Sequence, residues 1–400
     1  MNKLLILSCT ALVTGGLSAA TTVTGVTASQ DPATLVVTVQ YSLVKESAED
    51  PDSVIVTADV KANGASLAGY LDYLRGDVNK LLSIDGQKTF TWHPQKEGFV
   101  GPISSVTIDL KTWCVTNPPD YMVVDLAAKK NVWYYENKDL VPFGVTNSLY
   151  KTTQLVMRKI PANAVRWQQG KASPTVNTGE QKQRWCTLRH DYFMGIYEFT
   201  RGQYKLVNGN SAYNDSQECP VNNIGFETLR GATASYNWPA NGHNVGGTSV
   251  IGKLRTLTGL KFDLPTGAEW EYACRAGTSG AQYGTLADIA WYNNSATAAQ
   301  PVGLKAANNW GLYDMIGNVF EYCLDWMSYT AESADAEVED PEGPTDYTAL
   351  SNRGNGGRMW RGGCYSYSAT YATATYPYTW GKVGTAAVLG FRVCCPIEEE

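Results

Sequence analysis

The sequence is poor in the residues that many catalytic centres and nucleic-acid interfaces use. Only three of its 400 residues are histidines: His93, His190 and His243. It has no CxxC pair, which argues against a zinc site, and no G-x-S-x-G context for a Ser-His-Asp triad. The net charge of -6 at pH 7, without a cluster of Lys or Arg, argues against a phosphate-binding surface. We therefore expect no nucleic acid among its partners.

Long apolar runs are missing after the first 20 residues. The chain opens with one Lys, an apolar run from Leu4 to Val13 and small residues that suit cleavage before Thr21, a pattern typical of a secretory signal peptide. Cys9 offers an alternative as a lipid acceptor, although few residues precede it. No later run approaches the roughly 18 apolar residues that a membrane helix needs. We expect an exported chain, in the periplasm, at the cell surface or secreted, without a membrane span.

Eight cysteines remain beyond that leader. An even number in an exported chain permits disulfides, but eight cysteines allow roughly 105 pairings and the sequence does not choose among them. Structural disulfides and free thiols both stay open. The residues are Cys114, Cys186, Cys219, Cys274, Cys323, Cys364, Cys394 and Cys395.

Residues 21–112 alternate apolar and polar residues in short runs separated by polar turns, as in a small antiparallel sandwich. The runs are residues 34–44, 53–62, 88–94 and 104–113. Residues 70–84 are the exception and suggest a short helix. We expect an all-β immunoglobulin-like or fibronectin-like spacer without enzymatic function, following a signal peptide at residues 1–20.

Residues 113–184 hold two strand-like runs and read as connecting strands at the entry to a second domain, residues 185–397. That domain is rich in Trp, Tyr, Gly and Asn with few long periodic segments, which favours a compact domain with much irregular structure. Thr200 with Gln203, and Thr266 with Glu269, match the capping box and predict two helix starts. In the second helix, Trp270, Ala273 and Cys274 fall on one face, which we expect to be core.

Five motifs in order resemble the formylglycine-generating enzyme, or sulfatase-modifying factor, family. They are YFMGIYEFTRGQY (192–204), PVNNIGFE (220–227), FDLPTGAEWEYACRAGT (262–278), NNWGLYDMIGNVFEYCLDW (308–326) and the pair RGGCY and GFRV between 361 and 393. The resemblance begins near residue 120. It implies an α+β fold, a variant of the C-type lectin fold.

The family's chemistry is not matched by the residues. The enzyme oxidises a sulfatase cysteine with two copper-binding cysteines in a pattern like R-G-G-S-Y-x-C-x-x-x-x-C, because soft Cu(I) selects sulfur ligands. That pattern puts Tyr367 and Ala372 at the two cysteine positions, and neither side chain ligates copper. Iron-dependent relatives use a His-rich constellation that three histidines do not supply. We expect no copper, no iron and no catalytic residue.

The resemblance also implies a structural Ca2+. Family members bind it through the positions of Asp314, Gly317, Val319 and Glu321, the first and last by carboxylates and the others by carbonyls. Hard Ca2+ prefers oxygen ligands of this kind. The alternative is that Asp314 caps a turn and Glu321 hydrogen-bonds within a Trp-rich core.

The segment from Cys364 to Val388 has an unusually narrow composition. Tyr, Thr, Ala and Ser supply five, five, five and two of its 25 residues. Antigen-combining loops favour Tyr and Ser, because Tyr gives rigid contact area and Ser adaptable hydrogen bonds. The segment also resembles, in composition and place, the mutable face of the family's variable proteins, which retroelements diversify. An ordinary half-buried strand fits the alternation of Tyr and Thr equally.

We therefore expect a non-catalytic protein that binds a protein or glycan through this segment. The alternatives are a formylglycine-generating or divergent oxidase that uses Cys364 or Cys323, and a purely structural module. The expected ligand-binding residues are Tyr365, Ser366, Tyr367, Ser368, Thr370, Tyr371, Thr373, Tyr376, Tyr378 and Trp380.

Overall fold

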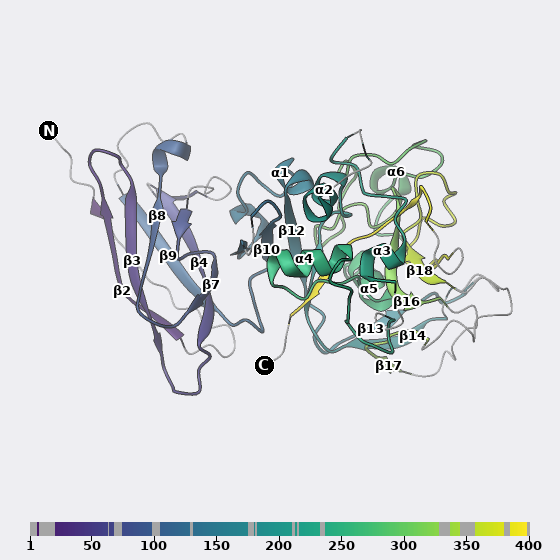
Figure 1. Ribbon diagram of the computed structural model, residues 1–400, viewed down its shortest axis with the longest axis horizontal. Helices are drawn as coiled ribbons and strands as arrows, with labels where there is room; N and C mark the ends of the chain where they lie inside the picture. The colour runs from purple at the N-terminus through teal and green to yellow at the C-terminus, as the bar shows by residue number, and fades with distance from the viewer. Residues whose placement is uncertain are drawn as a thin grey trace. The chain divides into compact units, whose positions relative to one another are not determined.

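The chain forms two compact units in the computed structural model (Figure 1). One comprises residues 1–123, 132–147 and 397–400, and the other residues 124–131 and 148–396. The structure describes residues 6–7, 21–62, 64–67, 74–97, 105–128, 131–174, 180, 182–209, 213, 216–232, 237–327, 337–344, 357–379 and 385–397. No helix in these stretches is both long and apolar enough to cross a membrane.

The first unit is built from strands in two sheets. One sheet has the order β1-β9-β4-β5, with β7 also pairing with β4, and the other has the order β2-β3-β8-β6. The strands are β1 (Ile6–Leu7), β2 (Thr21–Gln30), β3 (Val37–Lys45), β4 (Ser53–Ala62), β5 (Ala65–Ser66), β6 (Leu74–Gly76), β7 (Lys80–Ser83), β8 (Gln87–Trp92) and β9 (Ser105–Trp113). The four predicted strand runs are thus present. The 3-10 helix η1 (Pro94–Glu97) lies between β8 and β9. Strands β10 (Tyr121–Asp125) and β11 (Val132–Tyr135) and the 3-10 helix η2 (Lys138–Leu140) follow β9.

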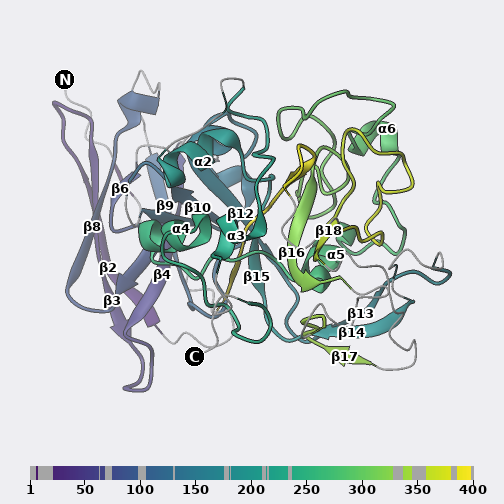
Figure 2. The ribbon, with the colours of Figure 1, turned by 45° about the vertical axis from the view of Figure 1, so that its right-hand side comes forward.

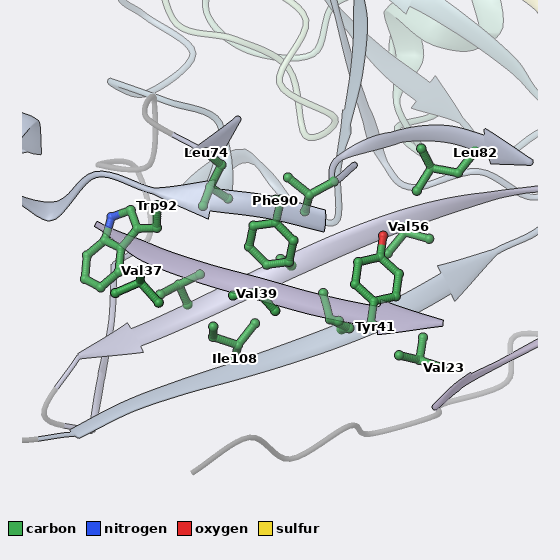
Figure 3. Close-up of a cluster of buried hydrophobic side chains, with 14 of the residues drawn as sticks. Val23, Val37, Val39, Tyr41, Val56, Leu74, Leu82, Phe90, Trp92 and Ile108 are labelled. Carbon is green, nitrogen blue, oxygen red and sulfur yellow. The ribbon is translucent and has the colours of Figure 1, made fainter. Parts of the chain in front are cut away.

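Alternation along the strands explains the core of this unit. In β3 the buried side chains are Val37, Val39, Tyr41 and Leu43, every second residue, because successive side chains of a strand point to opposite faces. Figure 3 shows Val37, Val39 and Tyr41 beside Phe90 of β8 and Ile108 of β9, so that both sheets contribute to one apolar cluster.

The helix predicted over residues 70–84 is wrong for the residues that the structure describes. Leu74–Gly76 form β6 and Lys80–Ser83 form β7. Gly76 has φ +115°, outside the helical region, and a Cβ at this position would lie 2.4 Å from the carbonyl oxygen of Thr89. The close approach of β8 therefore selects glycine here and ends any helical run.

The second unit mixes short helices, short strands and long irregular connections, which confirms the predicted α+β class. Its longest described helices, α4 and α5, have nine residues each. The helices are α1 (Leu149–Thr152), α2 (Arg201–Asn208), α3 (Phe226–Arg230), α4 (Val250–Thr258), α5 (Gly267–Arg275) and α6 (Leu286–Ile289). The strands are β12 (Gln154–Ile160), β13 (Val165–Gln169), β14 (Arg184–Leu188), β15 (Tyr192–Gly195), β16 (Phe320–Trp326), β17 (Val338–Glu339), β18 (Arg358–Arg361), β19 (Leu389–Gly390) and β20 (Cys394–Pro396).

Both predicted capping boxes are present. The Thr200 hydroxyl accepts the Gln203 N–H at the start of α2, and Thr266 serves Glu269 in the same way at the start of α5. In each box the side chain three residues on returns a bond to the backbone N–H of the threonine, which satisfies two of the free N–H groups at the helix start. Trp270, Ala273 and Cys274 of α5 are fully buried, as the spacing predicts.

Three small sheets organise the second unit. β15 pairs with both β12 and β20, and β14 pairs with both β13 and β17. Residues 113–184, expected to form the entry to the second domain, thus supply β12 and β13 to these sheets. The third sheet has the order β18-β16-β19, and every residue of β16 is buried. Figure 2 shows β16 and β18 side by side, with α5 packed next to them. The chain between β18 and β19 contains the tyrosine-rich segment.

Candidate functional site

The tyrosine-rich segment leaves β18 through two glycines. Gly362 and Gly363 have φ +91° and +79°, which favours glycine. A Cβ on Gly363 would lie 2.8 Å from the carbonyl oxygen of Tyr371 and 3.0 Å from the Cα of Ala372. The absence of a side chain thus lets residues 364–379, here named the tyrosine loop, fold back over the end of the strand.

The tyrosine loop is a series of turns. Backbone N–H groups of Tyr367, Tyr371 and Ala372 each donate to a carbonyl three residues earlier, a turn pattern rather than a sheet ladder. The β-strand alternative for this segment is therefore wrong over residues 362–379, where one isolated bridge joins Tyr378 to Trp360. Turns replace the strand because this part of the loop closes on itself.

Aromatic rings fix the loop on the sheet. The ring of Tyr378 stacks on Phe320 of β16, with centroids 5.3 Å apart. Tyr367 meets Phe320 edge-on at 5.3 Å, and its hydroxyl lies 3.5 Å from that of Tyr378. Tyr371 contacts Tyr367, Tyr376 and Tyr378 in T-shaped pairs at 5.1, 4.8 and 5.6 Å. Such pairs stabilise beyond the area they bury, so the rings are held rather than free.

The loop alternates between held and exposed side chains. Tyr365, Tyr367, Tyr371, Thr373, Tyr376 and Tyr378 are half-buried, whereas Ser366, Ser368 and Thr370 are exposed. Burial raises the pKa of the Tyr365 and Tyr367 hydroxyls above the usual range. Trp380 lies outside the described residues. The structure therefore brings nine of the ten expected ligand-binding residues onto one short loop.

Tyr367 and Ala372, which the resemblance aligned with copper-binding cysteines, carry a phenol ring and a methyl group. Tyr367 places its ring among Phe320, Tyr371 and Tyr378, and Ala372 is 1% exposed. Cys364 is buried, its thiol lies 3.6 Å from the Ser366 hydroxyl, and burial raises the pKa of that thiol. A raised pKa keeps sulfur protonated, which disfavours both nucleophilic attack and metal binding.

The expected calcium ligands lie just beneath the tyrosine loop, but their oxygens differ in how they are engaged. The carboxylate of Glu321 accepts from Arg392 at 2.8 Å and from the indole N–H of Trp270 at 2.7 Å. Asp314 accepts the Gly303 N–H at 2.6 Å through Oδ2, while its buried Oδ1 has no hydrogen-bond partner among the described residues. Burial raises the pKa of Asp314 to about 6. Asp314 therefore has a free oxygen that could bind a cation, whereas Glu321 is already paired with the Arg392 cation.

The backbone N–H groups of Gly317 and Val319 both donate hydrogen bonds, the first to a backbone carbonyl and the second to a side-chain carboxylate. The Gly317 N–H donates to Gly362 at 2.8 Å, and the Val319 N–H donates to Glu198 at 3.0 Å. The described residues contain no group of three or more His, Cys, Asp or Glu arranged to hold a metal ion. A carboxylate pair beside a bound arginine is thus what the protein itself provides at this position.

Sequence reasoning missed Glu198 as part of this cluster. Glu198 is 0% exposed and accepts from the Asn318 side-chain amide at 2.6 Å as well as from Val319. Burial, and then the charges of Asp314 and Glu321, raise the pKa of Glu198 well above its usual range. The only signal for it was its place in the YFMGIYEFTRGQY motif. Glu321 thus bonds the Arg392 guanidinium directly, while the charges of Glu198 and Asp314 act on that guanidinium without a hydrogen bond to it among the described residues.

The remaining histidines and cysteines are dispersed. His190 bonds Glu269 at 3.0 Å, and His243 bonds the buried Asp263 at 2.8 Å, in contacts that share no residue. Among the described residues, the eight cysteines from Cys114 to Cys395 form no disulfide, and seven of them are buried. Neither of the two histidine contacts involves a residue of the tyrosine loop.

The sequence of the second unit matches a known protein family. The family model described as the sulfatase-modifying factor enzyme 1-like domain matches residues 157–397, more than half of the chain. The chain belongs to this family. The matched range includes every sheet of the second unit except those parts before residue 157, and it contains the whole tyrosine loop.

Two proteins with similar sequences have different names. The chaperone protein LppX of Paenibacillus barcinonensis is 26% identical over 245 residues, which cover 51% of this chain and 79% of LppX. The formylglycine-generating enzyme of Thermomonospora curvata is 32% identical over 149 residues, 32% of this chain and 48% of the enzyme. The chain thus spans about half the length of that enzyme.

Among solved structures, the variable protein 1 of Treponema denticola aligns with 61% of this chain and 95% of its own, with a TM-score of 0.48 and 24% identity. The structure of PvdO from Pseudomonas aeruginosa aligns with 60% of this chain and 94% of its own, with a TM-score of 0.45 and 17% identity.

Proposed function

We propose that this family member is an exported ligand-binding protein that has no oxidase activity, and that the tyrosine loop is its binding face. The observation that carries the proposal is the exchange at the two copper positions, where Tyr367 is locked among aromatic rings and Ala372 is buried. One fold hosts many sites, so family membership alone does not assign the enzyme's activity.

The arrangement of the loop supports binding. Half-buried tyrosines present rigid amphipathic rings, and exposed Ser366, Ser368 and Thr370 surround them with hydroxyl groups that both donate and accept. Because the rings are already fixed against Phe320 and each other, little side-chain freedom is lost on binding. A face of this composition resembles the aromatic and hydroxyl-rich loops that antibodies use.

Binding is tested with two sets of probes, a printed oligosaccharide array and a phage-displayed peptide library. The wild-type protein should bind at least one probe that Tyr371→Ala and Tyr376→Ala do not bind. Truncation of a central aromatic anchor should lower the affinity about 30-fold or more. Leu206→Ser, an exposed position on α2, serves as the matched control and should retain it. A protein that retains no tyrosine-dependent probe from either set contradicts the proposal.

The oxidase alternative predicts a different result. Incubated with copper, oxygen and a sulfatase-derived cysteine peptide, an active enzyme converts the thiol to an aldehyde, and Cys364→Ser or Cys323→Ser abolishes that conversion. We expect no aldehyde by mass spectrometry from the wild-type protein. Turnover that depends on either cysteine would establish the oxidase instead.

We further propose that the tyrosine loop is a diversified segment. It is bracketed by fully buried family residues, Arg361 before it and Phe391 after it, so its exposed positions can change without touching the frame. The test is the DNA beside the gene: a near-copy of the final coding segment that differs at adenines, next to a reverse transcriptase. A neighbourhood with neither feature contradicts diversification and leaves the binding proposal standing.

A calcium ion at Asp314 is a separate proposal. Of the four expected ligands Asp314, Gly317, Val319 and Glu321, Asp314 has the unpartnered Oδ1 that supports a bound cation, whereas Glu321 is already paired with Arg392. Calcium should raise the Tm relative to EDTA. At a free calcium concentration of 100 times Kd, it should raise the free energy of unfolding by about 2.7 kcal/mol. Asp314→Asn should remove that increment, and Asp288→Asn, an exposed matched control, should not. Equal Tm values with calcium and EDTA contradict the site.

Export rests on the leader-like first 20 residues. Protein recovered from the cells that make it should begin at Thr21 when its N-terminus is sequenced. A mature protein that begins at Met1 contradicts export by this route.

A further inference from the structure

A second segment lies against the tyrosine loop. The turn that follows α6, residues 291–295, is bonded to it directly, because the Asn293 N–H donates to the carbonyl of Tyr367 at 3.1 Å. Asn318 links the two segments a second time, since its N–H donates to Trp291 and its carbonyl accepts from Tyr365, both at 2.8 Å. Figures 1 and 2 both show the C-terminal yellow loop beside the chain around α6. The two segments therefore form one continuous backbone platform.

The turn presents the same kind of chemistry as the loop. Asn293, Asn294 and Ser295 are exposed, and Tyr292 is half-buried. The Ser295 hydroxyl accepts the Tyr292 N–H at 2.9 Å and thereby closes the turn. Two amide side chains, each with donors and an acceptor, are thus placed next to the exposed hydroxyls of the loop.

Charge is absent from both segments. The sequence contains no Asp, Glu, Lys or Arg from residue 289 to 304 or from residue 362 to 381. Two cations close to the described part of the platform, Lys305 beside Trp291 and Arg201 near Tyr365, are engaged within the protein. The Lys305 ammonium lies 4.2 Å from the centre of the Trp291 ring and donates to the Ala287 carbonyl at 2.5 Å, and the Arg201 guanidinium lies over the ring of Tyr213 at 4.7 Å. A ligand on this face therefore meets rings, hydroxyls and amides.

We propose that the tyrosine loop and the Tyr292–Ser295 turn together bind a neutral oligosaccharide. This inference rests on the proposed binding function and adds to it the second segment and the chemical class of the ligand. A sugar ring offers an apolar C–H face to a tyrosine ring and hydroxyl edges to polar neighbours. Asn293, Asn294, Ser366 and Ser368 supply groups that both donate and accept, as sugar hydroxyls require.

A protein partner fits the face less well. Protein surfaces carry charged side chains, and a charged group that is desolvated against an uncharged face loses water without gaining a partner. Protein interfaces are enriched in Tyr, as this face is, but also in Arg, which both segments lack. A neutral saccharide avoids this penalty, because none of its groups is ionised. Binding should consequently depend little on salt, since ionic screening acts on charges.

The experiment measures the affinity of the full chain for six neutral hexasaccharides, those of cellulose, amylose, laminarin, xylan, mannan and chitin, by calorimetry at low and high salt. At least one should bind, with less than about a twofold change in Kd between the two salts. Asn293→Ala combined with Asn294→Ala should weaken binding about tenfold, the loss expected from two neutral hydrogen bonds. Asn163→Ala, at an exposed asparagine on the turn before β13, is the matched control and should bind as the wild type does.

The outcomes separate this inference from the proposed function. Loss of binding in Tyr371→Ala with no change in the Asn293 and Asn294 double variant removes the turn from the site and leaves the binding face in place. Tyrosine-dependent binding of a peptide, or of a sulfated or sialylated glycan, with none of the six hexasaccharides bound, overturns the ligand class and keeps the function. Failure of every probe overturns both.

Discussion

The buried frame of the second unit and the tyrosine loop that it carries differ in how their side chains are satisfied. In the frame, Glu321 and Arg392 are at most 1% exposed and bond each other, Trp270 and backbone carbonyls. In the loop, the side chains of Tyr367, Tyr371 and Tyr378 contact neighbouring rings, and those of Ser366, Ser368 and Thr370 face solvent. Charged side-chain bonds thus fix the frame, while ring contacts and backbone hydrogen bonds hold the loop, so its exposed side chains can change without breaking either.

The largest expected effect is on the frame. Arg392→Met should lower the free energy of unfolding by about 3–5 kcal/mol, because it leaves Glu321, Glu198 and Asp314 buried without their cation. Urea unfolding followed by circular dichroism measures this loss. Lys138→Met, which breaks the exposed pair with Asp139, is the control and should cost less than about 1 kcal/mol.

Arg392→Lys keeps the charge and should recover part of the stability that Arg392→Met loses. A variant Arg392→Met within about 1 kcal/mol of the wild type would contradict the frame's dependence on this ion pair.

The frame should also make stability depend on pH. Burial raises the pKa of Asp325 to about 6 from its ordinary 3.8. Between these values the folded chain binds more protons than the unfolded chain, so the free energy of unfolding falls as pH rises from about 4 to about 6 and levels off above. The fall from this residue is about 3 kcal/mol, at roughly 1.4 kcal/mol per pKa unit.

Asp325→Asn should flatten that part of the profile, measured as urea unfolding at four pH values. Ser368→Ala on the loop should leave the profile unchanged. Parallel profiles for wild type and Asp325→Asn would show that Asp325 does not titrate in this range.

Substitutions in the tyrosine loop should lower stability less than those in the frame, and only where they remove an aromatic ring. Tyr378→Ala should cost about 2 kcal/mol, because its ring contacts Phe320, Trp360, Tyr367 and Tyr371. Ser368→Ala should change stability by less than about 0.5 kcal/mol. Thermal unfolding of both variants checks this ranking, and an equal loss in both would erase the difference between held and exposed positions.

Local signals in the sequence predicted local structure well. The capping boxes at Thr200 and Thr266 and the buried face of α5 depend on residues within one or two helical turns. The helix expected at residues 70–84 failed because the conformation of Gly76 is set by β8, which approaches it from another part of the sheet.

The site was predictable only in part for the same reason. The motifs located the tyrosine loop, and their spacing aligned Tyr367 and Ala372 with the enzyme's copper-binding cysteines. The partner of Glu321 is Arg392, 71 residues away, and Glu198 reaches Val319 across 121 residues. Residue periodicity along the sequence does not predict contacts between residues this far apart. The Asn293 bond to Tyr367 is equally long-range, which is why the second segment of the face was not expected.

The measurement that tests the account most directly compares wild type and Tyr371→Ala on the same oligosaccharide array and peptide library. Tyr371 lies at the centre of the loop's rings and has no part in the buried frame. We predict that wild type retains a probe that Tyr371→Ala loses while its circular dichroism spectrum stays that of the wild type. Identical retention of every probe by the two folded proteins would contradict the tyrosine loop as a binding face.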